Sequence, residues 1–583
     1  MSSRFRKVAI GLTSLLMAAP AIAQIESSGL GDLDAWGASF LERGESRFGS
    51  GLWSNSDPEY LLALFERIDV SALSTAEKEL LSRALRSPAS APEGDLADEL
   101  QGVRLDLLHA LGERRATASL AGQMGDAPDD FNSDIILSDN RLARGEVDIV
   151  CAQMNTSGEG RFWSELRAIC ALKAGEPTSA ELAIEIAGQQ EGAEPWFTEV
   201  AFAMLAEAED RPPARYGSGL QLTLSDMAGL EPDADSLSAD RPDVAAIIAK
   251  DAERSLDLRL AAAAIAAEAG LLSASRHRGL YEELIAGDEF EPQSATEAAF
   301  VVLEKEVAVE KPMIDISPET SDGPMDLRSM TGGFTEAIEP EDLDEAPLAE
   351  EDPDAISVAE EQALAVREAL RDATSDPVRF AAAARLFAKA LESIPANEDT
   401  SGVAPAFAAA ALSNGSRELA LKWLDNVDAD EQDDEARFNA ALLRGYALIL
   451  AAERPAEEIE DIVSTLLETG YEAAQTQDIL QLFSVWSAFD VTLPVIARAT
   501  LAQSEIDARP IGSGILLAIE DAQRTGATGE ALLTILTQTD GQIETLSGAG
   551  LATVLRSLGR MGADADAQAL AMDAAQLRTF VRD

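Results

Sequence analysis

HALGE at residues 109–113 recurs as LARGE at 142–146 and as LKAGE at 172–176, each time directly after an apolar run with helical spacing. The three glycines are 33 and then 30 residues apart. Glycine directly after a helix supplies the left-handed backbone conformation that satisfies the last carbonyl groups, and the glutamate that follows suits the positive end of the next helix. Each unit is therefore predicted to be a helix, a tight turn and a second helix. A period of 30 to 35 residues is typical of a helical-repeat solenoid.

Helical periodicity extends along most of the chain. Apolar residues recur on one helical face near residue 61, near residue 162 and again near residue 551, and Ser74 with Glu77 forms a capping-box pattern. The alternation typical of a strand is confined to residues 220–224. Aromatic residues make up only 5% of the chain, which favours closely packed helices over sheets. We predict an all-α fold, a helical-hairpin repeat solenoid in two halves.

Two segments are predicted to interrupt the helices. Residues 211–242 contain four prolines and a Gly-Ser-Gly sequence, a composition typical of a long loop. Residues 336–361 contain 12 acidic residues and no basic ones, which indicates a disordered acidic linker over residues 305–358. The resulting organisation is a signal peptide at 1–23, an N-terminal helical repeat domain at 24–304, the linker, and a C-terminal helical repeat domain at 359–583.

The N-terminus has the pattern of a secretory signal. Three basic residues precede an apolar run, and Ala21-Ile22-Ala23 is a small-x-small cleavage site before Gln24. A membrane anchor, the alternative, needs about 20 apolar residues, and this run is shorter. No later stretch is long and apolar enough to span a bilayer. We therefore expect a periplasmic protein, with secretion as the alternative.

The chain contains only two cysteines, Cys151 and Cys170, and the periplasm would allow them to pair. Cys151 lies in a predicted helix that ends near Asn155, and Cys170 in one that starts near Gly160. A hairpin between these helices brings the two cysteines close together, so we predict a structural disulfide. Two buried thiols are the alternative.

The turns resemble those of tetratricopeptide repeats, in which a Gly between the two helices is followed five residues later by Ala. Gly175 with Ala180, Gly415 with Ala420 and Gly562 with Ala567 match this spacing. The early Trp and Tyr and the closing Pro of that family are not regularly present. The resemblance, a degenerate one spread over both halves, implies a superhelix with a concave surface that binds a partner.

Charge and motif content exclude several function classes. With 45 basic and 104 acidic residues, the net charge of −59 disfavours binding to nucleic acid or anionic lipid. The phosphate-binding P-loop pattern is absent. His109 and His277 are the only histidines and neither has a partner at zinc-ligand spacing, so we expect no metal site and no cofactor.

Two functions remain open. The first is a non-catalytic periplasmic scaffold or adaptor that binds an envelope or periplasmic protein or peptide. Trp36, Trp53 and Trp196 are the first residues to consider as partner contacts, although we favour core or incidental positions for them. The second is an accessory or catalytic part in peptidoglycan or envelope polysaccharide processing. Glu45-Ser46 resembles the catalytic Glu-Ser of lytic transglycosylases, but it precedes the helices rather than following them. We expect no catalytic residue and no deep cleft in which ionisable side chains converge.

Overall fold

The structure of the chain is a computed structural model. It describes residues 35–124, 133–154, 158–287, 290–309, 357–425, 434–470, 472–503 and 509–582. Within these ranges the regular elements are 27 α-helices and six short 3-10 helices, and the only β-type pairing is an isolated bridge between Arg509 and Leu546. The predicted all-α fold of helical hairpins is therefore confirmed. Across the same ranges, no helix has both the length and the apolar character that crossing a membrane requires.

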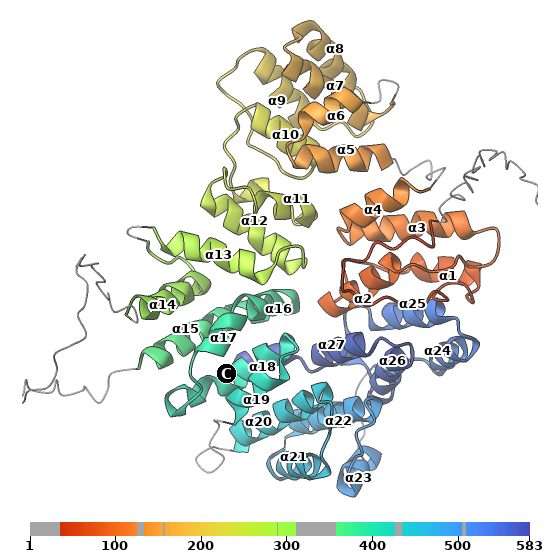
Figure 1. Ribbon diagram of the computed structural model, residues 1–583, viewed down its shortest axis with the longest axis vertical. Coiled ribbons are helices and arrows are strands. Elements are labelled where there is room, and N and C mark those ends of the chain that lie inside the picture. The colour runs from red at the N-terminus through yellow and green to blue at the C-terminus, as the bar shows by residue number, and fades with distance from the viewer. Residues whose placement is uncertain are drawn as a thin grey trace, which may run out of the picture.

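The N-terminal part consists of α1 (Pro58–Phe65), α2 (Thr75–Arg86), α3 (Ala97–Ala110) and α4 (Arg114–Ala121). A protruding upper lobe follows, made of α5 (Ser133–Ala143), α6 (Val147–Gln153), α7 (Arg161–Ala174), α8 (Pro177–Gly188), α9 (Pro195–Leu205) and α10 (Gly219–Met227). The chain then returns through η1 (Ala234–Ser236), α11 (Pro242–Ile248), α12 (Leu256–Glu268), α13 (Ala274–Ile285) and α14 (Ala295–Val309). Figure 1 shows the lobe at one end of the molecule.

The second half begins with α15 (Val358–Asp372), η2 (Ala373–Ser375), α16 (Pro377–Leu386), α17 (Ala388–Ser393), η3 (Glu398–Val403), α18 (Ala404–Ser413) and α19 (Arg417–Leu424). It continues with α20 (Asp434–Ala447), η4 (Leu448–Leu450), α21 (Ala456–Thr469), α22 (Ala473–Ala488) and α23 (Val495–Gln503). It ends with α24 (Ser513–Thr525), α25 (Thr528–Thr539), η5 (Ile543–Thr545), α26 (Gly548–Arg560), α27 (Asp564–Ala574) and η6 (Leu577–Val581).

The predicted glycine turns are confirmed by their backbone conformation. Gly112, Gly145 and Gly175 have φ angles of 76°, 76° and 70°, the left-handed region that glycine adopts without strain. At the end of α7, the Gly175 N–H donates to the Leu172 carbonyl and the Glu176 N–H to the Ala171 carbonyl, 3.1 and 3.0 Å away. These bonds satisfy carbonyl groups that the helix leaves open and turn the chain into the next helix.

The predicted disulfide is present between α6 and α7. The sulfur atoms of Cys151 and Cys170 are bonded, and their Cα atoms are 5.6 Å apart. Residues 155–157, between these helices in the sequence, lie outside the described residues. The bond fastens the short α6 to the core of the upper lobe, where Trp163 and Leu166 of α7 are buried.

Reduction of this disulfide should destabilise the upper lobe by about 3 kcal/mol, because the bond restricts a loop of 19 residues in the unfolded chain. The measurement is urea unfolding of the parent protein with and without a reductant. A Cys151→Ser, Cys170→Ser double variant should unfold like the reduced parent and should not respond to the reductant. An equal response of both proteins to the reductant would contradict this role.

The half of the chain that precedes residues 310–356 packs against the half that follows them. Helix α14 contacts α15, and the rings of Tyr281 and Phe300 stack at 4.8 Å while Phe300 lies 5.4 Å from Phe387. Buried residues before and after this segment belong to one hydrophobic cluster. Helix α14 continues to Val309, so its last residues overlap the start of the predicted linker at residue 305. The rest of the predicted acidic linker, residues 310–356, lies outside the described residues.

The first helices also pack against the last ones, so that the described helices follow a closed path (Figure 1). We call this contact of α1 and α2 with α25, η5 and α27 the seam. The Gly529 N–H donates to the Leu52 carbonyl at 2.7 Å, and the Gly541 N–H donates to Glu77 Oε2 at 2.8 Å. Gly529 faces Trp53 so closely that a Cβ there would be 2.3 Å from the indole ring. The seam is therefore closely packed and hydrogen bonded.

A cluster of buried charges, the neck cluster, joins the N-terminal helices, the upper lobe and α11. Arg241 Nη2 lies 2.9 Å from Asp139 Oδ2 of α5, and its Nε lies 2.9 Å from Asp243 Oδ1. Arg114 Nε of α4 lies 3.1 Å from Asp243 Oδ2. Burial alone would raise the pKa of Asp243, but hydrogen bonding and charge from Arg241 and charge from Arg114 hold that pKa below its usual value.

One predicted loop is wrong. Within residues 211–242, the segment from Gly219 to Met227 forms α10, which Ser218 caps by accepting a hydrogen bond from the Gln221 N–H. Leu220, Leu222 and Leu224 are all buried, so the alternating pattern reflects a helix covered on several sides rather than a strand.

Candidate functional site

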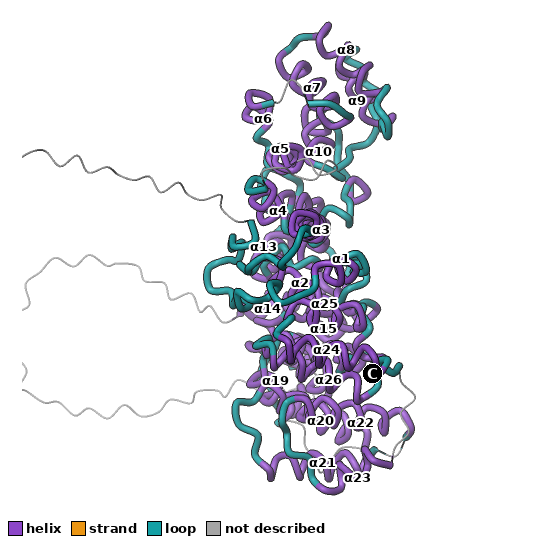
Figure 2. Tube along the Cα trace, turned by 90° about the vertical axis from the view of Figure 1, so that its right-hand side faces the viewer, coloured by secondary structure: helices purple, strands orange, loops and turns teal. Residues whose placement is uncertain are grey.

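The closed path of helices surrounds a cavity of about 1360 Å³. Its walls come from α2, the end of α3, the entry to α11, the end of α12 and the start of α27. These elements are distant in sequence and lie around the middle of Figure 1. Seen from the side, the helices form a narrow slab (Figure 2). The cavity therefore exists only because the seam and the neck cluster bring the chain back on itself.

The walls of this central cavity are predominantly negative. They carry nine acidic side chains and three basic ones, Lys78, Arg83 and Arg86, counted over the residues that the structure describes. Arg83 forms an ion pair with Asp566, and Arg86 Nη1 lies 2.9 Å from Glu45 Oε2. The remaining excess of carboxylates suits positively charged groups of a partner.

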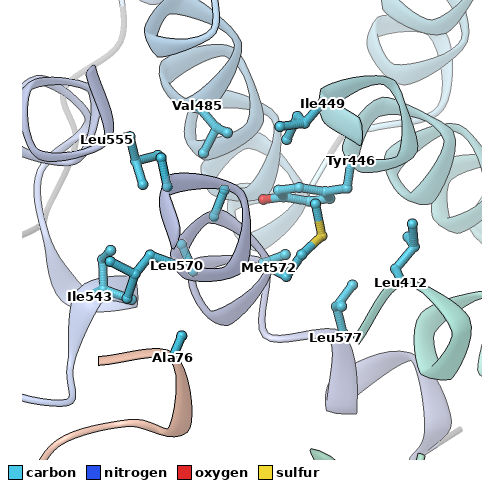
Figure 3. Close-up of a cluster of buried hydrophobic side chains, with 14 of the residues drawn as sticks. Ala76, Leu412, Tyr446, Ile449, Val485, Ile543, Leu555, Leu570, Met572 and Leu577 are labelled. Carbon is cyan, nitrogen blue, oxygen red and sulfur yellow. The ribbon is translucent and has the colours of Figure 1, made fainter. Parts of the chain in front are cut away.

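A second cavity of about 650 Å³ adjoins the first and shares Thr75, Ala76 and Glu79 of α2 with it. It lies where α2 meets α16, the end of α18, η5, α27 and η6, and we call it the seam cavity. Most of its lining is apolar. Figure 3 shows the packing that holds α27 beside it, with Tyr446, Ile449, Val485, Leu555, Leu412, Leu577 and Ala76 among the labelled side chains.

Asp573 of α27 is the most strongly perturbed acid of the seam cavity. Its Oδ2 accepts a hydrogen bond of 2.7 Å from Ser74 Oγ, the N-cap residue of α2. Burial raises the pKa of Asp573 to about 7, and the negative charges of Glu77, Glu544 and Glu79 act in the same direction. This carboxyl therefore changes its protonation near neutral pH.

Asp573→Asn should stabilise the protein at alkaline pH relative to the parent. The pKa of Asp573 is raised from 3.8 to about 7 on folding, so the stability that its protonation contributes is fully present below pH 4, falls as the pH increases and is lost as the pH rises through 7. Since the side chain is only partly buried, we expect the stability of the variant relative to the parent to increase by about 2 kcal/mol between pH 5 and pH 8. Urea unfolding at both pH values measures this change. Asp564→Asn, an exposed change on the same helix, should show a constant difference, and a constant difference for Asp573→Asn would contradict the proposed burial effect.

Other carboxylates around the two cavities are also perturbed. Burial raises the pKa of Glu79, and the charge of Asp566 adds to this whereas Arg385 opposes it. Burial likewise raises the pKa of Asp566 and of Glu268, against the opposing charges of Arg83 and Arg379. From the sequence we expected no deep cleft in which ionisable side chains converge. That prediction is therefore wrong. The two cavities form only when distant segments pack together.

The tryptophans that we considered as partner contacts are core residues. Trp36, Trp53 and Trp196 are 3%, 0% and 4% exposed. Trp36 and Trp53 pack with their rings 6.4 Å apart, and Trp196 Nε1 donates to the Pro213 carbonyl at 2.8 Å. Each of these aromatic side chains is used to hold irregular backbone against the helices.

The remaining candidate residues from the sequence, Glu45 and His277, are held by contacts within the protein. Glu45 lines the central cavity but is engaged in the ion pair with Arg86. His277 is buried and packs on Tyr281, and burial lowers its pKa to about 4, so it is neutral at physiological pH. In the ranges that the structure covers, no group of three His, Cys, Asp or Glu side chains is arranged to hold a metal ion.

Asp573, Arg385 and Arg578 of the seam cavity were not found from the sequence. They belong to segments nearly 200 residues apart, and none lies in a motif with a fixed spacing. The only local signal was the Ser74–Glu77 capping box, which the structure confirms and which positions Ser74 against Asp573.

In comparisons with known proteins, no protein-family model, no curated protein and no solved structure matches this chain.

Proposed function

We propose that this protein is a non-catalytic scaffold or adaptor that binds a protein or peptide partner around its central cavity. The observation that carries this proposal is the closed path of helical hairpins around a cavity of about 1360 Å³ with a predominantly acidic wall. Helical-repeat proteins present large curved surfaces suited to partners, and this wall suits a partner with basic side chains. The tetratricopeptide-like turns support the same reading.

We further propose that the protein acts in the periplasm, with secretion as the alternative. Residues 1–23 have the composition of a secretory signal, and disulfides such as that of Cys151 and Cys170 persist in oxidising compartments.

Site-directed crosslinking tests the scaffold. Ala110→Cys places a thiol at the exposed wall of the central cavity, and Glu185→Cys places one on the exposed face of α8 in the upper lobe. A photo-crosslinker on each thiol, activated in intact cells, should capture one stoichiometric partner from position 110 and not from position 185. Equal capture from both positions, or none from position 110, would argue against a partner in the cavity.

One observation favours a second candidate, a role in peptidoglycan or envelope polysaccharide processing. Asp573 is a carboxyl with a pKa near 7 that borders a cavity together with Glu79 and Glu544, and a general acid requires such a pKa. Purified protein incubated with peptidoglycan distinguishes the candidates. Release of muropeptides that is lost in Asp573→Asn would overturn the scaffold proposal, whereas an inert protein would support it.

A further inference from the structure

The seam cavity has the dimensions and lining of a ligand site. A volume of about 650 Å³ falls within the range of pockets that hold drug-sized molecules. Its apolar wall includes Val378 and Phe380 of α16, Leu412 of α18 and Met572 of α27. Charged side chains of both signs interrupt this wall, and they enter it from different elements.

Two arginines supply the positive groups. Arg578 Nη1 donates to the Thr374 carbonyl at 3.2 Å, and Arg385 Nη2 donates to the Ala267 carbonyl at 3.4 Å. Neither guanidinium is in an ion pair with a carboxylate of the described residues, although the chain has 104 acidic residues against 45 basic ones. Each keeps donors that suit a carboxylate, which arginine binds through two parallel hydrogen bonds.

Three carboxyl groups supply the negative side: Glu79 from α2, Glu544 from η5 and Asp573 from α27. Over the described ranges, none of them is in an ion pair with a basic side chain. The negative charges of Glu79 and Glu544 each contribute to the raised pKa of Asp573, after the larger effect of burial. A bound ammonium group would offset these negative charges.

We infer that the seam cavity binds a short peptide with a free terminal carboxylate and a positively charged amino group. Arg385 and Arg578 bind the carboxylate, and Glu544 and Asp573 bind the amino group. The apolar wall contacts the residues between these two ends of the peptide. The cavity, at about 650 Å³, is larger than a single amino acid needs. This site adjoins the larger cavity in which we place the protein partner and shares Thr75, Ala76 and Glu79 with it.

Isothermal titration calorimetry of the full chain tests this site. The ligands are three unblocked tripeptides of alanine with lysine at the first, second or third position, at pH 7.5 and 150 mM salt. We expect saturable 1:1 binding of at least one of them. Amidation of its carboxylate should weaken that binding at least tenfold, and acetylation of its amino terminus should also weaken it.

Arg578→Gln should lose at least tenfold in affinity for the free peptide and should no longer distinguish the free peptide from its amide. Arg582→Gln is the matched control, since Arg582 Nη2 donates to the same Thr374 carbonyl at 3.1 Å but does not line the cavity. It should bind like the parent. Because the peptide modifications act on the unaltered protein, the comparison does not depend on how well a variant folds.

Absence of binding for all three peptides, or equal binding of the free and amidated forms, would overturn the site. An equal loss in Arg582→Gln would show that the arginines only hold Thr374. Crosslinking from Ala110→Cys reports on the central cavity separately, so failure of the peptide site is distinguishable from failure of the scaffold proposal.

Discussion

Gly541→Ala is expected to open the seam and to destabilise the protein by about 3 kcal/mol or more. Gly541 has a φ of 70°, and a Cβ at this position would lie 1.9 Å from the Ala72 carbonyl oxygen, a backbone atom that cannot rotate away. Movement of the backbone to avoid that contact would also remove the hydrogen bond from the Gly541 N–H to the buried Glu77. Backbone strain, overpacking and the loss of one of the hydrogen bonds that the buried Glu77 carboxylate accepts then act together.

Gly562→Ala is the matched control. Gly562 has a φ of 75° but has no atom within 4 Å of its Cβ position, so the substitution adds backbone strain without a close contact. We expect a loss of about 1 kcal/mol for this variant. Urea unfolding compares the two stabilities, and small-angle scattering shows whether the particle expands. Similar losses in both variants would mean that the seam tolerates the extra atom.

Arg241→Gln is expected to destabilise the neck cluster by about 3 to 5 kcal/mol. Arg241 contacts Asp139 and Asp243 at 2.9 Å each, and both carboxylates have side chains at most 14% exposed. Glutamine carries no charge to pair with them; Arg114 still pairs with Asp243, but Asp139 is left as a buried charge without its ion-pair partner. Because this cluster joins α4, α5 and α11, its loss should free the upper lobe from the rest of the molecule.

Arg524→Gln provides the comparison. Arg524 pairs with Asp521 on α24, but its side chain is 73% exposed, so we expect a change of at most about 0.5 kcal/mol. Hydrogen exchange of α5 and α11 should increase in Arg241→Gln and stay unchanged in Arg524→Gln. Unchanged protection in both variants would show that apolar contacts alone hold the neck.

Features that depend on neighbouring residues were predictable. The left-handed Gly112, Gly145 and Gly175 follow from hydrogen bonds between residues five or fewer positions apart. The pairing of Cys151 with Cys170 follows from one hairpin, since two antiparallel helices joined by a short turn bring such residues together.

Features that depend on burial by distant segments could not be decided from the sequence. The alternation of Leu220, Leu222 and Leu224 resembled a strand, because residue spacing alone does not reveal how many faces of a helix are covered. Trp53 was considered as a partner contact but fills the seam against Gly529, 476 residues further along the chain.

By itself, the sequence determined that the chain forms helical hairpins, where those hairpins turn and which cysteines can pair, because each of these depends on short-range hydrogen bonding and helical spacing. Only the tertiary structure decided that the first and last helices meet and that two cavities form between them. The seam joins Ser74 to Asp573 and Glu77 to Gly541. Contacts over such separations depend on the accumulated angles between successive hairpins, and no local pattern of residues encodes that sum.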